Sequence, residues 1–81
     1  MKPYSEILKQ QKKALNELIE YAGTKTRLAH HMDVSPQVVQ GWVNRGRISA
    51  TMAIEAEKIT NGAITKEYLR PDVVGWFKDA I

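Results

Sequence analysis

The sequence predicts an all-α domain of five helices with a long first helix. Three observations support this fold class: apolar residues recur at steps of three and four, hydroxyl side chains precede several expected helix starts, and glycine follows two expected helix ends. Steps of three and four place side chains on one face of an α-helix. Serine and threonine cap the amino termini of helices, and glycine commonly ends them.

Length and composition predict one small domain over residues 1–81. A chain of this size builds a single small core, and the lack of cysteine excludes a disulfide framework or a thiolate metal site. The apolar runs are a few residues long, whereas a membrane-spanning helix needs about 20. The amino terminus is too polar for a signal peptide. We therefore expect a cytoplasmic protein without a membrane contact.

The first helix is expected over residues 3–22 and should end at Gly23. Its predicted inward stripe contains Tyr4, Leu8, Gln11, Leu15, Leu18 and Ala22. The charged residues lie mostly off this stripe, which is typical of a core helix with one solvated face. A second interpretation is that residues 1–13 form an amino-terminal extension of the helix that overhangs the core. In that case Tyr4, Ile7 and Leu8 would pack on a partner subunit.

Residues 24–45 have the pattern of a helix-turn-helix motif. Thr24 is placed to cap a helix over residues 25–32, in which Leu28 and Met32 share a face. The small Ala29 beside them allows a second helix to cross closely, as this motif requires. Asp33 then occupies the turn.

The second helix of the motif begins at Pro36, after the capping residue Ser35. Val39 and Trp42 face the core. The opposite face is almost free of charge and presents Gln37, Gln40, Gly41 and Asn44. Amide side chains can pair bidentately with adenine in the major groove of DNA. Glycine inside a helix costs roughly 1 kcal/mol relative to alanine, so Gly41 indicates that a partner approaches the backbone closely.

Two more helices and an apolar tail follow. The helix over residues 50–60 should bury Met52, Ala53, Ala56 and Ile59. Asn61 and Gly62 should end it, and Thr65 can cap a short fifth helix that buries Leu69. The tail, residues 73–81, contains Val73, Val74, Trp76, Phe77 and Ile81. It either closes the core or supplies a dimer contact, because exposed apolar patches commonly mark interfaces.

Positive charge is concentrated in the half of the chain that carries the motif. Residues 1–47 hold eight Lys and Arg against four Asp and Glu, and residues 48–81 hold four against five. A basic surface is the electrostatic footprint of a nucleic-acid binder. No exposed aromatic platform for stacking RNA bases is evident. Double-stranded DNA is therefore the expected partner.

No pattern in the sequence is specific for catalysis. There is no glycine-rich phosphate loop and no nucleophile elbow. His30 and His31 are adjacent and point about 100° apart on a helix, and neither has an acidic or thiol partner four residues on. Glu55 and Glu57 fall on different helix faces and form no acid/base pair. We expect no enzyme activity, no cofactor and no metal.

The motif and the segment after it resemble a known family. The stretch LAHHMDVSPQVVQGWVNRG is similar to the helix-turn-helix of the phage Cro and repressor proteins, which implies a lambda-repressor-like fold. Together with AIEAEKITNGAITKEYLRPD, the segment from about residue 14 to 72 resembles the Cro-like YdaS-type prophage regulators more closely. The chain departs from the family pattern at Asp33, where glycine is usual, and in residues 1–13, which the pattern does not require.

This resemblance implies roles for individual residues. The residues expected near base edges are Ser35, Gln37, Gln40 and Gly41. The residues expected at backbone phosphates are Lys25, Arg27, Asn44, Arg45 and Arg47. Phosphate contacts of this kind fix the register of a protein on DNA without reading its sequence.

The predicted function is sequence-specific binding of double-stranded DNA by a homodimer on a palindromic operator, with repression by occlusion of polymerase. Half-sites spaced by roughly 34 Å, one helical turn, suit dimeric helix-turn-helix proteins. The alternative is an antitoxin-like module that masks a toxin or other protein partner, since the resembling family includes antitoxin-like proteins. Its working surface would be the amino-terminal extension or the tail at Trp76 and Phe77.

Overall fold

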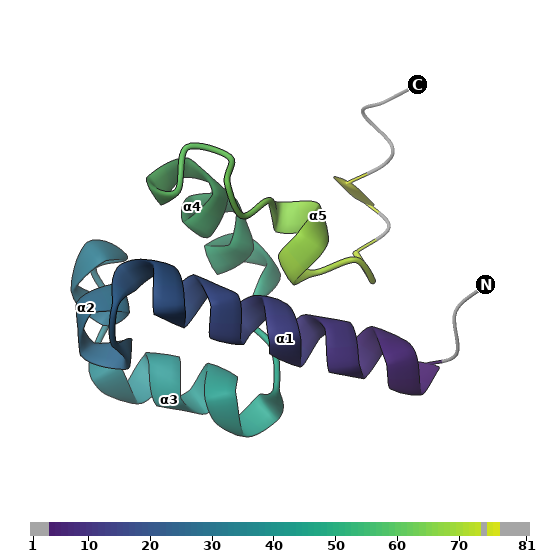
Figure 1. Cartoon of the computed structure of the whole chain (residues 1–81), viewed down its shortest axis with the longest axis horizontal. Helices are drawn as coiled ribbons and strands as arrows, with labels where there is room; N and C mark the ends of the chain where they lie inside the picture. Colours follow the sequence, from purple (N-terminus) through teal and green to yellow (C-terminus); the bar gives the residue numbers. More distant parts are fainter. Residues whose placement is uncertain (1–3, 74, 77–81) are drawn as a thin grey trace.

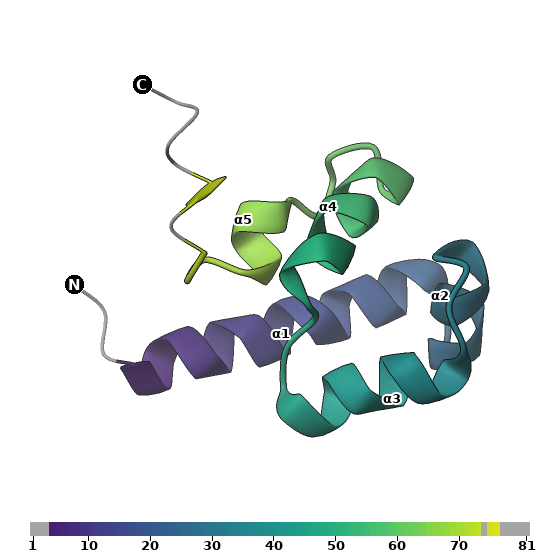
Figure 2. The same cartoon turned by 180° about the vertical axis from the view of Figure 1, so that it is seen from behind.

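The computed structural model describes residues 4–73, 75 and 76, and this part of the chain is all-helical. Its helices are α1 (Tyr4–Ala22), α2 (Lys25–His31), α3 (Pro36–Arg45), α4 (Ala50–Ile59) and α5 (Lys66–Leu69). α1 crosses the middle of the molecule, with α3 on one side, α4 and α5 on the other, and α2 at its carboxyl-terminal end (Figure 1). Figure 2 shows the same separation from behind. The predicted five-helix fold class with a long first helix is confirmed.

Four helices begin at a hydroxyl side chain. The N-cap residues of α2, α3, α4 and α5 are Thr24, Ser35, Ser49 and Thr65. In each case the hydroxyl oxygen accepts a hydrogen bond from the backbone N–H three residues on, at 3.1 to 3.4 Å. This satisfies an N–H that has no partner within the helix. Three of these caps were predicted, and Ser49 adds a fourth.

The core lies between α1 and the other helices. Its buried hydrophobic residues are Ala14, Leu15, Leu18, Leu28, Ala29, Met32, Val39, Trp42, Ile48, Ala53, Ala56, Ile64 and Leu69. Trp42 heads the fully buried side chains by size and is 2% exposed. Since it projects from α3, the position of that helix depends directly on the core. No helix in the described residues is both long enough and apolar enough to cross a lipid bilayer.

Two predicted core positions are exposed at the surface. Leu8 is 40% exposed, because the amino-terminal turns of α1 extend beyond the end of the neighbouring α3 (Figure 1). The buried stripe of α1 starts only at Gln11, which is 1% exposed. Ile59, in the last turn of α4, is 36% exposed. The side chain of Tyr4 lies outside the part that the structure describes.

The turn between α2 and α3 keeps its geometry despite the lack of glycine. Asp33 adopts a left-handed conformation with a φ of 56°, which aspartate tolerates better than most residues. The next amide, that of Val34, donates a hydrogen bond to the carbonyl of Ala29 at 3.0 Å. The departure from the family pattern therefore leaves the crossing of α2 and α3 in place.

The described part of the tail closes the core. Trp76 is half-buried and packs against the core residues. Its indole Nε1 donates a hydrogen bond to the carbonyl of Arg70 at 2.8 Å, and the Lys66 ammonium lies 5.5 Å from the ring centroid. Of the two predicted roles of the tail, closure of the core and contact in a dimer, Trp76 has the role of closing the core. Val74, Phe77 and Ile81 lie outside the described residues.

Candidate nucleic-acid interface

α3 has one buried face and one polar, exposed face. Val39 and Trp42 anchor the buried face in the core. Gln37, Gln40 and Asn44 are exposed on the other side. α3 has no acidic residue, and its last turn holds the basic Arg45. The core thus holds one side of the helix rigidly and leaves a row of amide groups accessible.

Hydrogen bonds join three of the predicted site residues across this exposed face. The Lys25 Nζ donates to Oε1 of Gln40 at 3.3 Å. The amide Nε2 of Gln40 donates to Oδ1 of Asn44 at 3.0 Å. Lys25 comes from the first turn of α2, so this contact bridges the two helices of the motif. The carboxamide of Gln40 is held with its oxygen toward α2 and its nitrogen toward the end of α3.

Gly41 is covered in part by a side chain of its own helix. A Cβ atom at this position would lie 3.3 Å from a guanidinium nitrogen of Arg45. The Arg45 side chain therefore turns back along the exposed face of α3 and lies over the glycine. The glycine at position 41 predicts the close approach of an outside partner. In the structure, the Arg45 guanidinium also lies close to this backbone position.

The other predicted site residues have contacts away from the amide row. The Ser35 hydroxyl is engaged as the N-cap of α3. Arg27 lies against Gly23, where a Cβ atom would be 3.2 Å from its guanidinium nitrogen. Arg47 extends to the carboxylate of Asp72, with 3.4 Å between its guanidinium nitrogen and Oδ2. These residues therefore do not form a single cluster with the amide row.

Asp72 joins distant parts of the chain. Its carboxylate accepts two hydrogen bonds from the Arg70 guanidinium, each of 2.9 Å, and one from the buried Gln11 amide at 2.7 Å. The Arg70 hydrogen bonds, followed by the charges of Arg70 and Arg47, lower the pKa of Asp72 below its usual 3.8. Asp72 thereby ties α1, the segment after α3 and the segment after α5 together.

Replacement of Asp72 by asparagine should lower the free energy of unfolding at neutral pH by about 1–2 kcal/mol, with allowance for the exposure of the carboxylate. A carboxylate with a lowered folded pKa stabilises the fold fully above its unfolded pKa, and this contribution is lost as pH falls through the folded pKa. The stability difference between wild type and Asp72→Asn should therefore be constant above about pH 5 and shrink below pH 3.8. Urea denaturation at a series of pH values measures it, and an unchanged difference at pH 2 would refute this role.

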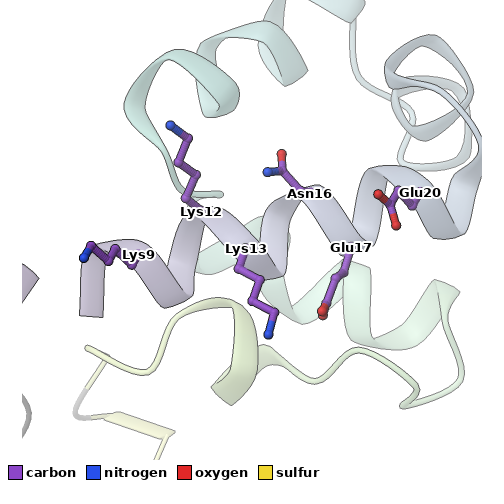
Figure 3. Close-up of a pocket in the computed structure, with 6 residues that line it drawn as sticks. All are labelled: Lys9, Lys12, Lys13, Asn16, Glu17 and Glu20. Atoms are coloured by element: carbon purple, nitrogen blue, oxygen red, sulfur yellow. The ribbon is translucent and has the colours of Figure 1, made fainter. Parts of the chain in front are cut away.

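Sequence reasoning missed a hollow between α1 and the end of α3. It has a volume of about 240 Å³, and its lining residues are Leu8, Lys12, Val43, Asn44, Arg45 and Gly46. On helical spacing alone, Lys12 belongs to the solvated face of the first helix. A second, shallower hollow of about 450 Å³ follows the surface of α1, and Lys12 also lines it (Figure 3). The sequence holds no signal for the first hollow, because it depends on how α1 packs against α3, whereas the second is lined by residues of α1 alone.

The described residues offer no arrangement for metal binding. Nowhere in residues 4–73, 75 and 76 do three or more His, Cys, Asp or Glu side chains come together in a group that could hold a metal ion. The rings of His30 and His31 meet edge to face, with centroids 6.2 Å apart.

The fold and the polar face of α3 define a small helix-turn-helix domain, and comparison with known proteins agrees. A model of the family described as bacterial toxin YdaS matches residues 15–77, and the chain belongs to this family. The chain is also similar to the Cro protein of prophage element Xfaso 1 in Xylella fastidiosa strain Ann-1. The two share 37% sequence identity over 76% of this chain and 95% of that one, with a TM-score of 0.70. No curated protein matches the chain. The predicted resemblance to Cro-like, YdaS-type prophage regulators is confirmed.

Proposed function

We propose that this protein is a non-enzymatic transcriptional regulator that binds double-stranded DNA through the major groove. The observation that carries the proposal is the exposed amide row of α3, in which Gln40 is held between Lys25 and Asn44. A helix of ten residues is about 15 Å long, and the major groove is about 12 Å wide and admits an α-helix. The likeness to a prophage Cro protein supports the same function.

The roles within this interface follow from position and chemistry. Gln37 and Gln40 would read base edges through their amides, with Ser35 at the entrance of the helix and Gly41 close to the groove floor. The phosphate contacts would come from Lys25, Arg27, Asn44, Arg45 and Arg47. For Arg47 such a contact competes with the ion pair to Asp72. A homodimer would place its two α3 helices in successive major grooves of a two-fold symmetric operator.

Salt dependence tests the proposal. Four cations in contact with phosphates on each half-site should make the logarithm of the binding constant fall with the logarithm of salt concentration, with a slope of about −3 to −4 per protomer. Fluorescence anisotropy with a labelled duplex between 50 and 300 mM salt measures this slope. Absence of binding to any duplex at the lowest salt would contradict the proposal.

A second candidate function is regulation through a protein partner, which the family description as a bacterial toxin favours. The sequence resemblance implied an antitoxin-like module, whereas the description of the matching family names a toxin. A cleft of about 110 Å³ is bordered by two apolar side chains, which a protein partner could contact. These are Tyr21, which is 57% exposed, and Ile59, which is 36% exposed. A partner complex retained at high salt, with no DNA binding at low salt, would favour this function over the first.

A further inference from the structure

The hollow between α1 and the carboxyl end of α3 combines two cations with an amide. Lys12 and Arg45 line it together with Asn44. Leu8 and Val43 supply apolar wall, and no carboxylate is among the lining residues. In the part of the chain that the structure describes, the ion pairs involve neither Lys12 nor Arg45. The hollow is thus a site of uncompensated positive charge.

The balance of charge in the hollow favours an anion. The carboxyl end of α3 contributes roughly half a negative charge from the helix dipole. The two side chains contribute two full positive charges. The Arg45 guanidinium offers several donors in a planar fork that matches phosphate oxygens, and the Lys12 ammonium acts as a compact charge.

The hollow also adjoins the predicted base-reading face. Asn44 lines the hollow and accepts the hydrogen bond from Gln40. Arg45 lines it and lies against Gly41. A ligand in the hollow would therefore lie beside the carboxyl end of the amide row, where the sugar-phosphate wall passes when α3 occupies a major groove.

We propose that this hollow binds a backbone phosphate of double-stranded DNA, with Lys12 and Arg45 as its cationic ligands and Asn44 as an amide donor. The inference rests on the proposed DNA-binding function and extends it, because it makes the long first helix part of the DNA-binding surface. Lys12 then anchors α1 to the strand that borders α3, and Leu8 and Val43 limit the access of water to the contact.

The chain offers a matched control for Lys12. Lys13 is the next residue and is likewise exposed. Figure 3 shows the two side chains pointing in different directions from α1. Both line the hollow along α1, but only Lys12 also lines the hollow beside α3. Both are lysines in the middle of one helix. Their alanine variants therefore change the net charge equally, and only Lys12→Ala alters the hollow beside α3.

The test compares the binding of wild type, Lys12→Ala and Lys13→Ala to one labelled duplex between 50 and 200 mM salt. Loss of one phosphate contact lowers the magnitude of the salt slope by about 0.9. The affinity advantage of wild type over Lys12→Ala should then shrink about 3.5-fold over this range. Lys13→Ala should keep the wild-type slope, and Lys12→Arg should restore most of it. Thermal unfolding of each variant confirms that the fold is intact, and Lys12→Gln replaces the alanine variant if it is unstable.

The outcomes separate the two proposals. If wild type binds DNA and Lys12→Ala has the same slope as Lys13→Ala, the phosphate site is refuted and the DNA-binding function stands. If wild type binds no duplex at 50 mM salt, the DNA-binding function is refuted and the site with it. An equal decrease of the salt slope in both variants would show that only the net charge of the protein affects DNA binding. That result would also refute the phosphate site.

Discussion

Replacement of Trp42 by alanine should lower the free energy of unfolding by about 3–5 kcal/mol, the usual cost of removing a large buried aromatic side chain. Trp42 is 2% exposed and anchors α3 in the core. A domain of this length has a total stability of about 4–12 kcal/mol. The loss is a large share of that total, so the variant should unfold at a much lower urea concentration than wild type, and DNA binding should disappear wherever the fold is lost.

Urea denaturation followed by circular dichroism measures this effect. Val38→Ala is the matched control, because Val38 lies on the same helix and is 41% exposed. That substitution should change the free energy of unfolding by about 0.5 kcal/mol or less. If Trp42→Ala retained the urea midpoint of wild type, the core would not determine the position of α3.

Replacement of Gln40 by alanine should weaken binding to the preferred operator by about 1–3 kcal/mol, or roughly 5- to 150-fold. The loss should be concentrated at one base pair in each half-site. Gln40 is exposed and held by Lys25 and Asn44, so its amide is already oriented before DNA binds. Such orientation reduces the entropy that the side chain loses on binding.

A set of duplexes with single base-pair changes distinguishes base reading from general weakening. Wild type should discriminate against changes at the base pair that Gln40 contacts, and Gln40→Ala should bind those duplexes about equally. Arg27→Ala provides the contrast, because Arg27 is a proposed phosphate ligand that lies against Gly23 rather than Gln40, and loss of a phosphate contact weakens binding uniformly across sequences. A uniform loss for Gln40→Ala as well would remove its base-reading role.

The sequence was sufficient for features that depend on neighbours along the chain. The caps at Thr24, Ser35 and Thr65 are local, since each hydroxyl bonds an amide three residues on. The burial of Val39 and Trp42 was predicted from helical spacing and is confirmed. Leu8 and Ile59 share that spacing with core residues and are nevertheless exposed, because their burial depends on how far the adjacent helices extend.

The residues of the candidate site could be predicted from the sequence, but most of the contacts between them could not. The sequence singled out Gln40, Asn44 and Lys25, but the bond between Lys25 and Gln40 spans 15 residues and requires the crossing of α2 and α3. The contact of Gln11 with Asp72 spans 61 residues and has no sequence signal. The proximity of Arg45 to Gly41 is different, because residues four apart on a helix are neighbours and this contact could have been predicted.

Selection of bound duplexes from a random pool tests the central claim, that α3 reads DNA sequence within a symmetric dimer. The expected result is enrichment of a palindrome whose half-sites are centred about 10 base pairs apart or at a multiple of that distance. Selection with Gln40→Ala should relax one position in each half of the palindrome and leave the others. A pool that remains random after selection with wild type would contradict sequence-specific binding, and an enriched site without two-fold symmetry would contradict the dimer.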